Sequence, residues 1–317
     1  MNTVTDVRVI NPSKSLRIDV MKDSNPSSII KYDKSIVIAG QFDHKIFWLN
    51  LDGTVVKTVG GHGKTSGLFD YPTSLTIDRT GLLWVADRWN HRIAAMDMDG
   101  SILKTIGSYG REPGQFSEPW GICSAGDSII VTDRNNHRVQ VFALDGTLLR
   151  IFGVPGPDQS YYESEEFRRG MVFDSWVRRS HRLKPPDVFF FKDDYKIGTM
   201  EYPLSAAYTE DGSVWVVDSG NDRLQKFSRD GQFQRSFSSS NSSLPLEFIA
   251  YVTAIDKRTI AVSSETSDSL YIMTIDGEIK ARLQKDGASL NAACATGDGH
   301  VLVLDSWNSV LYTFDIR

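Results

Sequence analysis

The sequence contains little cysteine, with only Cys123 and Cys294 among its 317 residues. Two cysteines are too few for a disulfide framework, and without a Cys-x-x-Cys pair the sequence lacks the usual sign of a zinc or thiol-redox site. It also lacks any stretch approaching about 18 consecutive apolar residues, so we predict no transmembrane segment. The first residues lack the basic and apolar regions of a signal peptide, so we expect a cytoplasmic location.

An excess of basic residues is missing as well. The chain holds 35 Lys and Arg against 40 Asp and Glu, which gives a formal net charge of -5. This balance gives no reason for nonspecific attraction to DNA, RNA or an anionic membrane, so any basic binding site must be local. The 40% of hydrophobic residues is ordinary for globular proteins and excludes wholesale disorder. We therefore expect a soluble, folded protein that does not bind DNA.

What the sequence does contain is a repeat. Asp-Gly pairs recur with spacings of 47, 46, 85 and 46 residues, at Asp52-Gly53, Asp99-Gly100, Asp145-Gly146, Asp230-Gly231 and Asp276-Gly277. The spacing of 85 residues corresponds to one period plus an insertion. Each pair lies between two segments in which apolar and polar residues alternate, such as 138–144 and 147–152. Two such segments joined by Asp-Gly predict a β-hairpin with a type I′ turn.

A second hairpin precedes the first in each repeat. In segments 72–87 and 203–218, a proline opens one strand, a glycine turn reverses the chain, and a strongly apolar strand follows. Each repeat thus predicts four short antiparallel strands, which we call a, b, c and d in chain order. A four-stranded repeat of this length is typical of a β-propeller blade. Six repeats can be counted, so we predict an all-β, six-bladed β-propeller that forms a single domain over residues 1–317.

A polar motif joins strands b and c. It reads Asp87-Arg-Trp-Asn-His-Arg92 in the second blade, with related copies in the third and fourth blades at 133–138 and 218–223. We expect the Asp to accept backbone N–H groups of the turn, the Asn to adopt the left-handed conformation, and the Arg to reach an acidic group on the sheet. This motif resembles the NHL-repeat family of six-bladed propellers. The resemblance extends over about residues 24–317, with weakened copies in the first, fifth and sixth blades.

The sixth repeat ends before its strand d. Residues Leu16 to Met21 alternate in hydrophobicity and precede the first blade. We therefore expect residues 1–23 to supply the closing strand of blade 6 and to pair with its strand c. Closing the ring in this way removes the free sheet edges.

An insertion at residues 154–199 separates blades 3 and 4. It makes up 46 residues but holds nine of the 34 aromatic residues of the chain. It also carries a cluster of basic residues that includes Arg178, Arg179 and Arg182. A long loop inside a compact fold is usually functional or disordered, and the aromatic content argues against disorder. We expect the insertion to dock on its own propeller or on a partner.

The order of the strands predicts two different faces. The b–c turns and the d–a loops share one face, which we call the top face, and the Asp-Gly turns lie on the opposite one. Aromatic and basic residues dominate protein interfaces, so we expect the top face to bind a partner. The candidate binding residues are Arg88, Trp89, Trp120, Arg134, Trp176, Arg178, Arg179, Arg182 and Trp307.

The candidates for chemistry are weaker. His44, His91 and His137 occupy one repeat position at the turn before strand c, so we interpret them as structural. His62, His181 and His300 show no ligand spacing. Cys123 and Cys294 also share one position on strand a of opposite blades, and we interpret them as packing residues, not as reactive thiols.

The resemblance supplies a second test of catalysis. The amidating lyases related to NHL proteins carry a Pro-His-Ser type segment at the start of strand a in several blades. The matching segments here are 72–74, 119–121 and 203–205, and none of them contains histidine. The Glu and Asp residues that would hold calcium in a gluconolactonase-like propeller are missing from these strands too. We therefore expect no catalytic centre, no metal and no cofactor.

The sequence thus favours a non-catalytic scaffold that binds another protein through its top face and its insertion. Two alternatives stay open. One is a small-molecule-binding propeller, or a lyase or hydrolase that acts at the mouth of the central channel. The other is an RNA-binding NHL propeller, since arginines beside aromatic rings combine charge with stacking surfaces.

Overall fold

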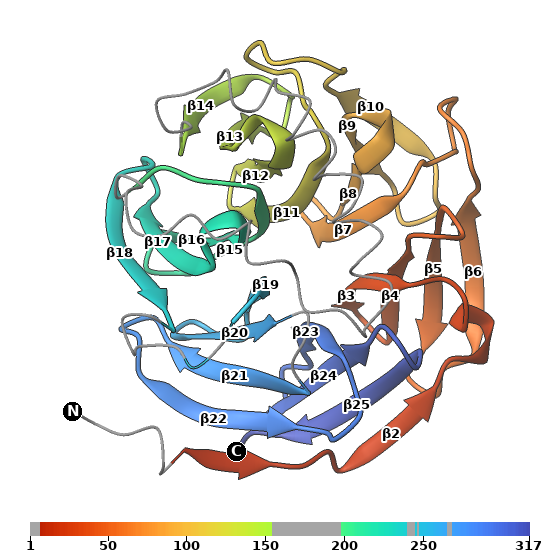
Figure 1. Cartoon of the computed structure of the whole chain (residues 1–317). Helices are drawn as coiled ribbons and strands as arrows, with labels where there is room; N and C mark the ends of the chain where they lie inside the picture. Colours follow the sequence, from red (N-terminus) through yellow and green to blue (C-terminus); the bar gives the residue numbers. More distant parts are fainter. Residues whose placement is uncertain (1–6, 154–197, 240–244, 246, 265–267) are drawn as a thin grey trace, which may run out of the picture.

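The protein is a six-bladed β-propeller in a computed structural model that describes residues 7–153, 198–239, 245, 247–264 and 268–317. Figure 1 shows the blades arranged around a central axis, with strand a of each blade nearest the centre and strand d at the rim. The all-β prediction, the six blades and their four antiparallel strands are confirmed. No helix among the described residues is both long and apolar enough to cross a membrane.

The strands follow the expected order in every blade. Blade 1 consists of β3 (Pro26–Tyr32), β4 (Ser35–Gly40), β5 (Lys45–Asn50) and β6 (Val55–Gly60). Blade 2 consists of β7 (Pro72–Ile77), β8 (Leu83–Asp87), β9 (Arg92–Met96) and β10 (Ile102–Ile106). Blade 3 consists of β11 (Pro119–Ala125), β12 (Ser128–Asp133), β13 (Arg138–Ala143) and β14 (Leu148–Phe152). Blade 4 consists of β15 (Pro203–Tyr208), β16 (Ser213–Asp218), β17 (Arg223–Ser228) and β18 (Phe233–Ser238). Blade 5 contains β19 (Ile249–Ala254), β20 (Thr259–Ser264), β21 (Ser269–Thr274) and β22 (Ile279–Gln284). Blade 6 contains β23 (Leu290–Ala295), β24 (His300–Asp305) and β25 (Val310–Asp315).

The hydrophobic core is divided among the interfaces between blades. Six clusters of buried apolar side chains occur, and each cluster joins two neighbouring blades. Strand b is buried on both faces because it is packed between the adjacent blades, as in β8 and β16. Trp84 and Trp215 share one position on this strand and are fully buried, which confirms that they are core residues. Their indole N–H groups are satisfied by Asp78 Oδ2 and Thr209 Oγ1.

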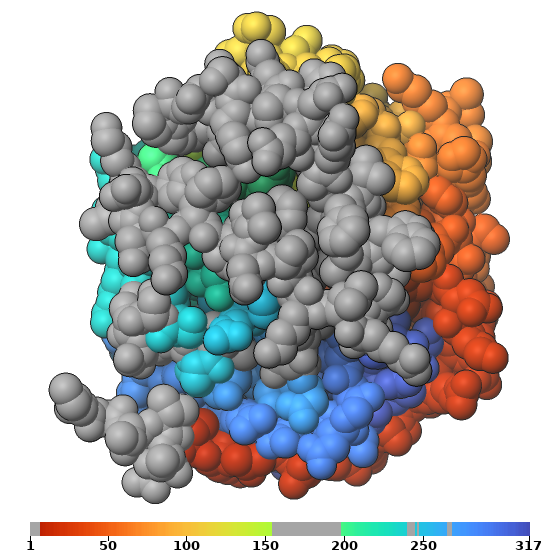
Figure 2. Space-filling model, in the orientation of Figure 1, coloured from red at the N-terminus to blue at the C-terminus, as the bar shows by residue number. Residues whose placement is uncertain are grey.

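The N-terminal segment closes the ring as predicted. Strand β2 (Lys14–Arg17) pairs antiparallel with β25 and completes the four-stranded sheet of blade 6. In Figure 2 the red N-terminal segment and the blue strands of blade 6 form one continuous rim. The ring closure also has a feature that the sequence did not predict. Strand β1 (Arg8–Ile10) pairs parallel with β22 and gives blade 5 a fifth strand.

The turns between strands c and d differ from the prediction. A type I′ turn needs positive φ at both Asp and Gly, whereas only the glycines have it, for example 86° at Gly53 and 96° at Gly100. In blade 1 the Gly53 N–H donates to Asn50 O, and Asn50 N–H donates to Thr54 O. The register of the two strands also shifts beside the turn. The connection is therefore a three-residue loop with a glycine bulge, and the predicted type I′ turn is wrong.

The outer strands are fastened to the next blade by long basic side chains. A basic residue stands four positions after the glycine of each of the first four Asp-Gly turns. It donates to a backbone carbonyl at the c–d turn of the following blade, in the pairs Lys57 with Met98, Lys104 with Leu144, Arg150 with Arg229, and Arg235 with Asp276. These four basic side chains are thus part of the structure and are not free cationic groups.

Candidate functional site

The polar motif between strands b and c forms a buried network. In blade 2, Asp87 Oδ1 accepts the N–H of Asp70 at 2.7 Å, and its Oδ2 accepts from Asn90 Nδ2 at 2.9 Å and Arg92 Nε at 2.7 Å. Asp133 and Asp218 repeat this arrangement in the next two blades. Burial raises the pKa of Asp87 even though these donors oppose the shift. The motif therefore ties the turn to its own blade, and the predicted reach of the arginine to an acidic group is confirmed.

Two details of the predicted turn are wrong. The left-handed residue is not the Asn but the residue after it, with φ of 53° at His91, 54° at His137 and 47° at Asp222. In blades 2 to 4 the Asp accepts the N–H at the start of strand a, and not that of the turn, because its carboxylate faces the preceding strand. Among the described b–c turns, only that of blade 6 has an Asp that accepts turn N–H groups, from Trp307 and Asn308.

The residue after the Asn links one blade to the next. Its side chain accepts the N–H of the residue directly before strand a of the following blade, or of the first residue of that strand. The pairs are His44 with Tyr71, His91 with Glu118, His137 with Tyr202, and Asp222 with Ile249. The three histidines each use Nδ1, at 3.0 to 3.2 Å. Burial lowers the pKa of all three imidazoles, to about 3 for His137. Each of the three accepts a hydrogen bond that joins two blades, as the structural interpretation predicted, and His44 also lies beside His62 and Asp70.

The top face of blades 1 to 4 carries a row of aromatic rings and arginines. Tyr71 and Trp89 are stacked, with ring centroids 4.4 Å apart. The guanidinium of Arg88 lies 5.5 Å from the centroid of the Trp89 ring and 4.2 Å from that of Trp120. The guanidinium of Arg134 lies 5.2 Å from the same Trp120 ring. Cation–π contacts thus join the b–c turns of blades 2 and 3 into one continuous surface.

Glu118 offsets part of the positive charge of both arginines of this row. Its Oε2 accepts from Arg88 Nε at 2.8 Å and from Arg88 Nη2 at 2.5 Å, and it lies 3.8 Å from Arg134 Nη1. Burial favours the neutral form of Glu118, but the two guanidinium charges outweigh this effect and lower its pKa. The side chains of Arg88 and Arg134 are only 12% and 11% exposed. Both are therefore held in place and are not free cationic groups.

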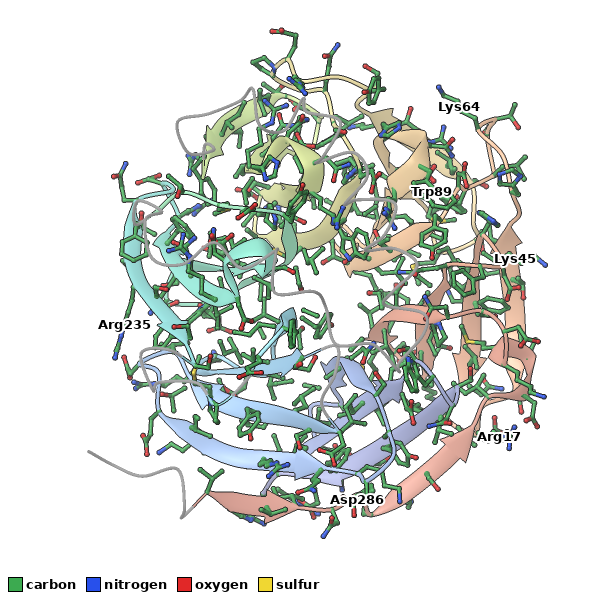
Figure 3. The ribbon with its side chains drawn as sticks, in the orientation of Figure 1. Arg17, Lys45, Lys64, Trp89, Arg235 and Asp286 are labelled. Carbon is green, nitrogen blue, oxygen red and sulfur yellow. The ribbon has the colours of Figure 1, made fainter. Side chains whose placement is uncertain are left out.

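Exposed aromatic side chains gather on the same face. Among the described residues, five aromatic side chains are classed as exposed: Tyr32, Phe42, Trp89, Tyr109 and Trp307. Four of them lie in b–c turns or d–a loops, whereas Tyr32 is the last residue of β3, beside the a–b turn on the opposite face. Figure 3 shows Trp89 closer to the centre of the ring than Lys64. The top face is thus the aromatic face of the part of the chain that the structure describes.

The structure places the predicted site residues unevenly. Trp89 and Trp307 are 44% and 48% exposed on the top face, on blades 2 and 6. Trp120 is partly buried against the core between blades 4 and 5. The remaining four candidates, Trp176, Arg178, Arg179 and Arg182, lie in the insertion, outside the described residues.

Sequence reasoning missed three residues that build this face, namely Tyr71, Glu118 and Tyr202. Each stands directly before the proline of strand a and has positive φ, for example 61° at Tyr71. Tyr202 lies under Arg134, with the guanidinium 4.9 Å from its ring centroid. The repeated position before the proline was the signal in the sequence that could have identified them.

The central channel contains a cavity of about 330 Å³. Its described wall is made by the strands a and contains no His, Asp or Glu side chain. Cys123 and Cys294 both line it, and burial raises the pKa of each thiol to about 12, so neither is a thiolate at neutral pH.

Hydroxyl groups of the channel wall are used to join blades. Ser28 Oγ accepts the N–H of Leu75, and Ser74 Oγ accepts that of Ile122, each on strand a of the next blade. Ser205 Oγ accepts from Val252 N–H in the same way. A nucleophilic serine needs an adjacent base, and the described wall offers no His, Asp or Glu for this role. These serines are therefore structural.

The fold and these turns define a β-propeller built from repeats with a b–c polar motif. The sequence model of the NHL repeat matches residues 69–96 and 116–142, which are the second and third blades. The chain is an NHL-repeat six-bladed β-propeller. No curated protein has a significantly similar sequence.

Solved structures share the fold at low identity. Virginiamycin B lyase from Staphylococcus aureus is 16% identical, with a TM-score of 0.57 and coverage of 96% of this chain and 88% of that one. A gluconolactonase from Xanthomonas campestris is 12% identical, with a TM-score of 0.59 and coverage of 98% and 87%. A chain of a nidogen/laminin complex is 13% identical, with a TM-score of 0.54 and coverage of 82% and 80%. At these identities the likeness concerns the fold alone.

Proposed function

We propose that this propeller is a non-catalytic scaffold that binds another protein on its top face. The observation that carries the proposal is the position of the exposed aromatic side chains, of which four of the five described lie on this face. Exposed aromatic clusters mark interaction sites on soluble proteins. Trp89 is the centre of the proposed surface, because it is exposed and its ring is held in place by Tyr71 and Arg88. A pre-organised aromatic ring loses little conformational entropy on binding.

We include the insertion in the proposed surface because of its composition. Trp176, Arg178, Arg179 and Arg182 combine an aromatic ring with charge, as interface residues commonly do. The insertion also follows directly on blade 3, whose b–c turn carries Arg134. The double substitution Trp176→Ala and Arg179→Ala is expected to weaken partner binding and to leave the Tm nearly unchanged. A large loss of Tm with intact binding would instead assign the insertion a purely structural role.

The channel argues against an enzyme of the lyase or lactonase type. General acid–base or metal-assisted chemistry needs titratable or metal-binding side chains at the site. The described wall offers Lys31 as its one charged side chain, together with two thiols of raised pKa and several structural hydroxyls. The RNA alternative is weakened by Glu118, because its carboxylate offsets part of the positive charge of the two arginines that would meet phosphate groups.

A site-specific photo-crosslinking experiment tests the proposal. A photoreactive phenylalanine analogue replaces Trp89 in one sample and Tyr32, on the opposite face, in the matched control. We expect one protein to be crosslinked from position 89 and not from position 32. The affinity of that protein for the purified chain should fall at least about tenfold with Trp89→Ala, because truncation of an aromatic hot spot costs roughly 2 kcal/mol or more of binding free energy. Equal crosslinking from both faces, or crosslinking to RNA that salt abolishes, would contradict the proposal.

A further inference from the structure

Three metal-binding side chains meet at the junction of blades 1 and 2 on the top face. They are His44 in the b–c turn of blade 1, His62 in the loop after β6, and Asp70 just before β7. One donor atom of each lies within 4.8 Å of the others. Asp70 Oδ1 lies 3.2 Å from His44 Nδ1 and 3.5 Å from His62 Nε2. No spacing typical of metal ligands surrounds His62 in the sequence, because the three residues come from separate connections.

The hydrogen bonds of this cluster are incomplete. His44 Nδ1 already accepts the N–H of Tyr71 at 3.0 Å, so it has no proton to donate to Asp70. Asp70 Oδ1 is buried and has no hydrogen-bond partner in the described part of the chain. The buried carboxylate oxygen therefore lies beside a neutral imidazole nitrogen that cannot donate to it, which is unfavourable unless a positive charge compensates it. A cation bound to Asp70 Oδ1 would supply that charge, and at His44 Nδ1 it would replace the N–H of Tyr71.

The next repeat provides an internal reference. There, His91, Tyr109 and Ser117 occupy the positions of His44, His62 and Asp70, and the bridges from 62 to 69 and from 109 to 116 show the same local pairing. The imidazole of His91 packs on Tyr109 with ring centroids 4.8 Å apart, much as His44 packs on His62 at 4.6 Å. The next repeat therefore keeps a ring at the position of His62 but carries no imidazole there, and it replaces the carboxylate of Asp70 with a hydroxyl. Acids recur at the position of Asp70 in blades 4 and 5, as Glu201 and Glu247, so the second imidazole is what distinguishes this copy from the next one.

We propose that His44, His62 and Asp70 bind a zinc ion at the junction of blades 1 and 2. Two imidazoles and one carboxylate are a typical three-residue donor set for zinc, with the fourth position left to a solvent molecule or a ligand. Ligand bonds of about 2.0 to 2.1 Å in a tetrahedral site place donor atoms roughly 3.3 Å apart, close to the two Asp70 distances. The side chain of His62 is 70% exposed, so the ion can reach the site from solvent.

The chemistry of the cluster sets the expected strength of binding. Burial lowers the pKa of His44, so its imidazole is neutral and competent as a ligand at pH 7. The N–H of Tyr71 competes with the ion for His44 Nδ1. We therefore expect weaker binding than at a structural zinc site whose four ligands are all free. The bound ion would fasten the loop at 61–69 to blade 1.

Calorimetric titration of the untagged, chelator-treated full-length chain with Zn²⁺ tests the site, with Co²⁺ absorption as a second readout of tetrahedral geometry. The variants are His62→Tyr and Asp70→Ser, which introduce the residues of the next repeat and should therefore fold. The matched control is His300→Gln, which removes a partly buried histidine that lies 2.9 Å from Asp298. We expect one ion to bind per chain in the wild type and in the control. The affinity for Zn²⁺ should fall by about 100-fold or more in the two variants, because each of them lacks one of the three ligands.

Three outcomes would overturn the proposal. One is equal Zn²⁺ affinity of the wild type and His62→Tyr, which would place any bound zinc elsewhere in the chain. Another is loss of binding in His300→Gln. The third is a wild type that shows no Zn²⁺ binding by calorimetry and no tetrahedral Co²⁺ absorption.

Discussion

Leu16 lies opposite Leu311 in the sheet of blade 6, although 295 positions separate them in the chain. This pairing couples the N-terminal segment to the last described strand of the propeller. A second link lies beside it, where Ser309 Oγ donates to Met21 O at 2.7 Å. The side chains of Ile18 and Met21 are buried in the core between blades 6 and 1. The ring is therefore held by apolar packing as well as by the strand pairs.

Substitution of Met21 tests the contribution of this closure. Met21→Ala should lower the free energy of unfolding by about 2–5 kcal/mol, because its fully buried side chain leaves a cavity. Val20→Ala is the matched control, since Val20 is 53% exposed and its loss should cost less than about 0.5 kcal/mol. Denaturant unfolding at constant pH measures both. Equal stability of the two variants would contradict the closure as a source of stability.

Deletion of residues 1–23 is the stronger form of this test. It removes β2 and leaves blade 6 with three strands and an open edge. We expect a large loss of Tm and a less cooperative transition. Deletion of residues 1–12 removes only the parallel strand β1 and should have a much smaller effect. A closing strand that could be deleted without loss of Tm would contradict this account of the ring.

The b–c motif should respond to the loss of its asparagine. Asn136 donates to Asp133 Oδ2 and to Gly110 O, both at 2.9 Å. Asn136→Ala removes a donor from a buried carboxylate and should cost about 1–3 kcal/mol of unfolding free energy. Asn50→Ala, at an exposed position in blade 1, is the control and should change little. Selective loss of partner binding in a normally stable Asn136→Ala would mean that this turn is a binding site.

Glu118 should stabilise the top face through its charge. Glu118→Gln keeps the shape of the side chain but leaves the guanidinium groups of Arg88 and Arg134 without their anionic partner. Because these groups are mostly buried, we expect a loss of about 2–3 kcal/mol in unfolding free energy. Asp276→Asn breaks the exposed pair with Arg258 and should cost less than about 1 kcal/mol. Denaturant titrations of both variants decide whether the network contributes.

Glu201 should make the stability depend on pH. Burial, and then the nearby charge of Asp218, raises its pKa from 4.5 to about 7. Because the folded state favours the protonated form, this contribution to stability is complete below pH 4.5 and is lost as the pH rises through 7. Glu201→Gln cannot ionise, so at pH 8 it should be more stable than the wild type by on the order of 2 kcal/mol. The advantage should vanish at pH 4.

Thermal unfolding of the wild type and Glu201→Gln between pH 4 and 8 measures this difference. A constant difference over the whole range would show that Glu201 does not titrate near neutral pH. The matched control is Glu210→Gln, whose carboxylate is exposed and pairs with Lys257. Its stability difference from the wild type should stay small at every pH, because an exposed carboxylate gains little from either protonation state.

The sequence by itself determined the repeat, the four strands of each blade, the number of blades and the origin of the closing strand. Alternating hydrophobicity, prolines before strand a and glycines at turns are local signals, and each acts within one hairpin. Tertiary structure decided what the local pattern leaves open. It placed His62 and Asp70 beside His44. It brought Arg88 and Arg134 to the carboxylate of Glu118. It also put His91 instead of Asn90 in the left-handed conformation and added β1 to blade 5. These contacts depend on how one blade lies against the next, and that arrangement is set by core packing between whole sheets, which a hairpin's own sequence does not encode.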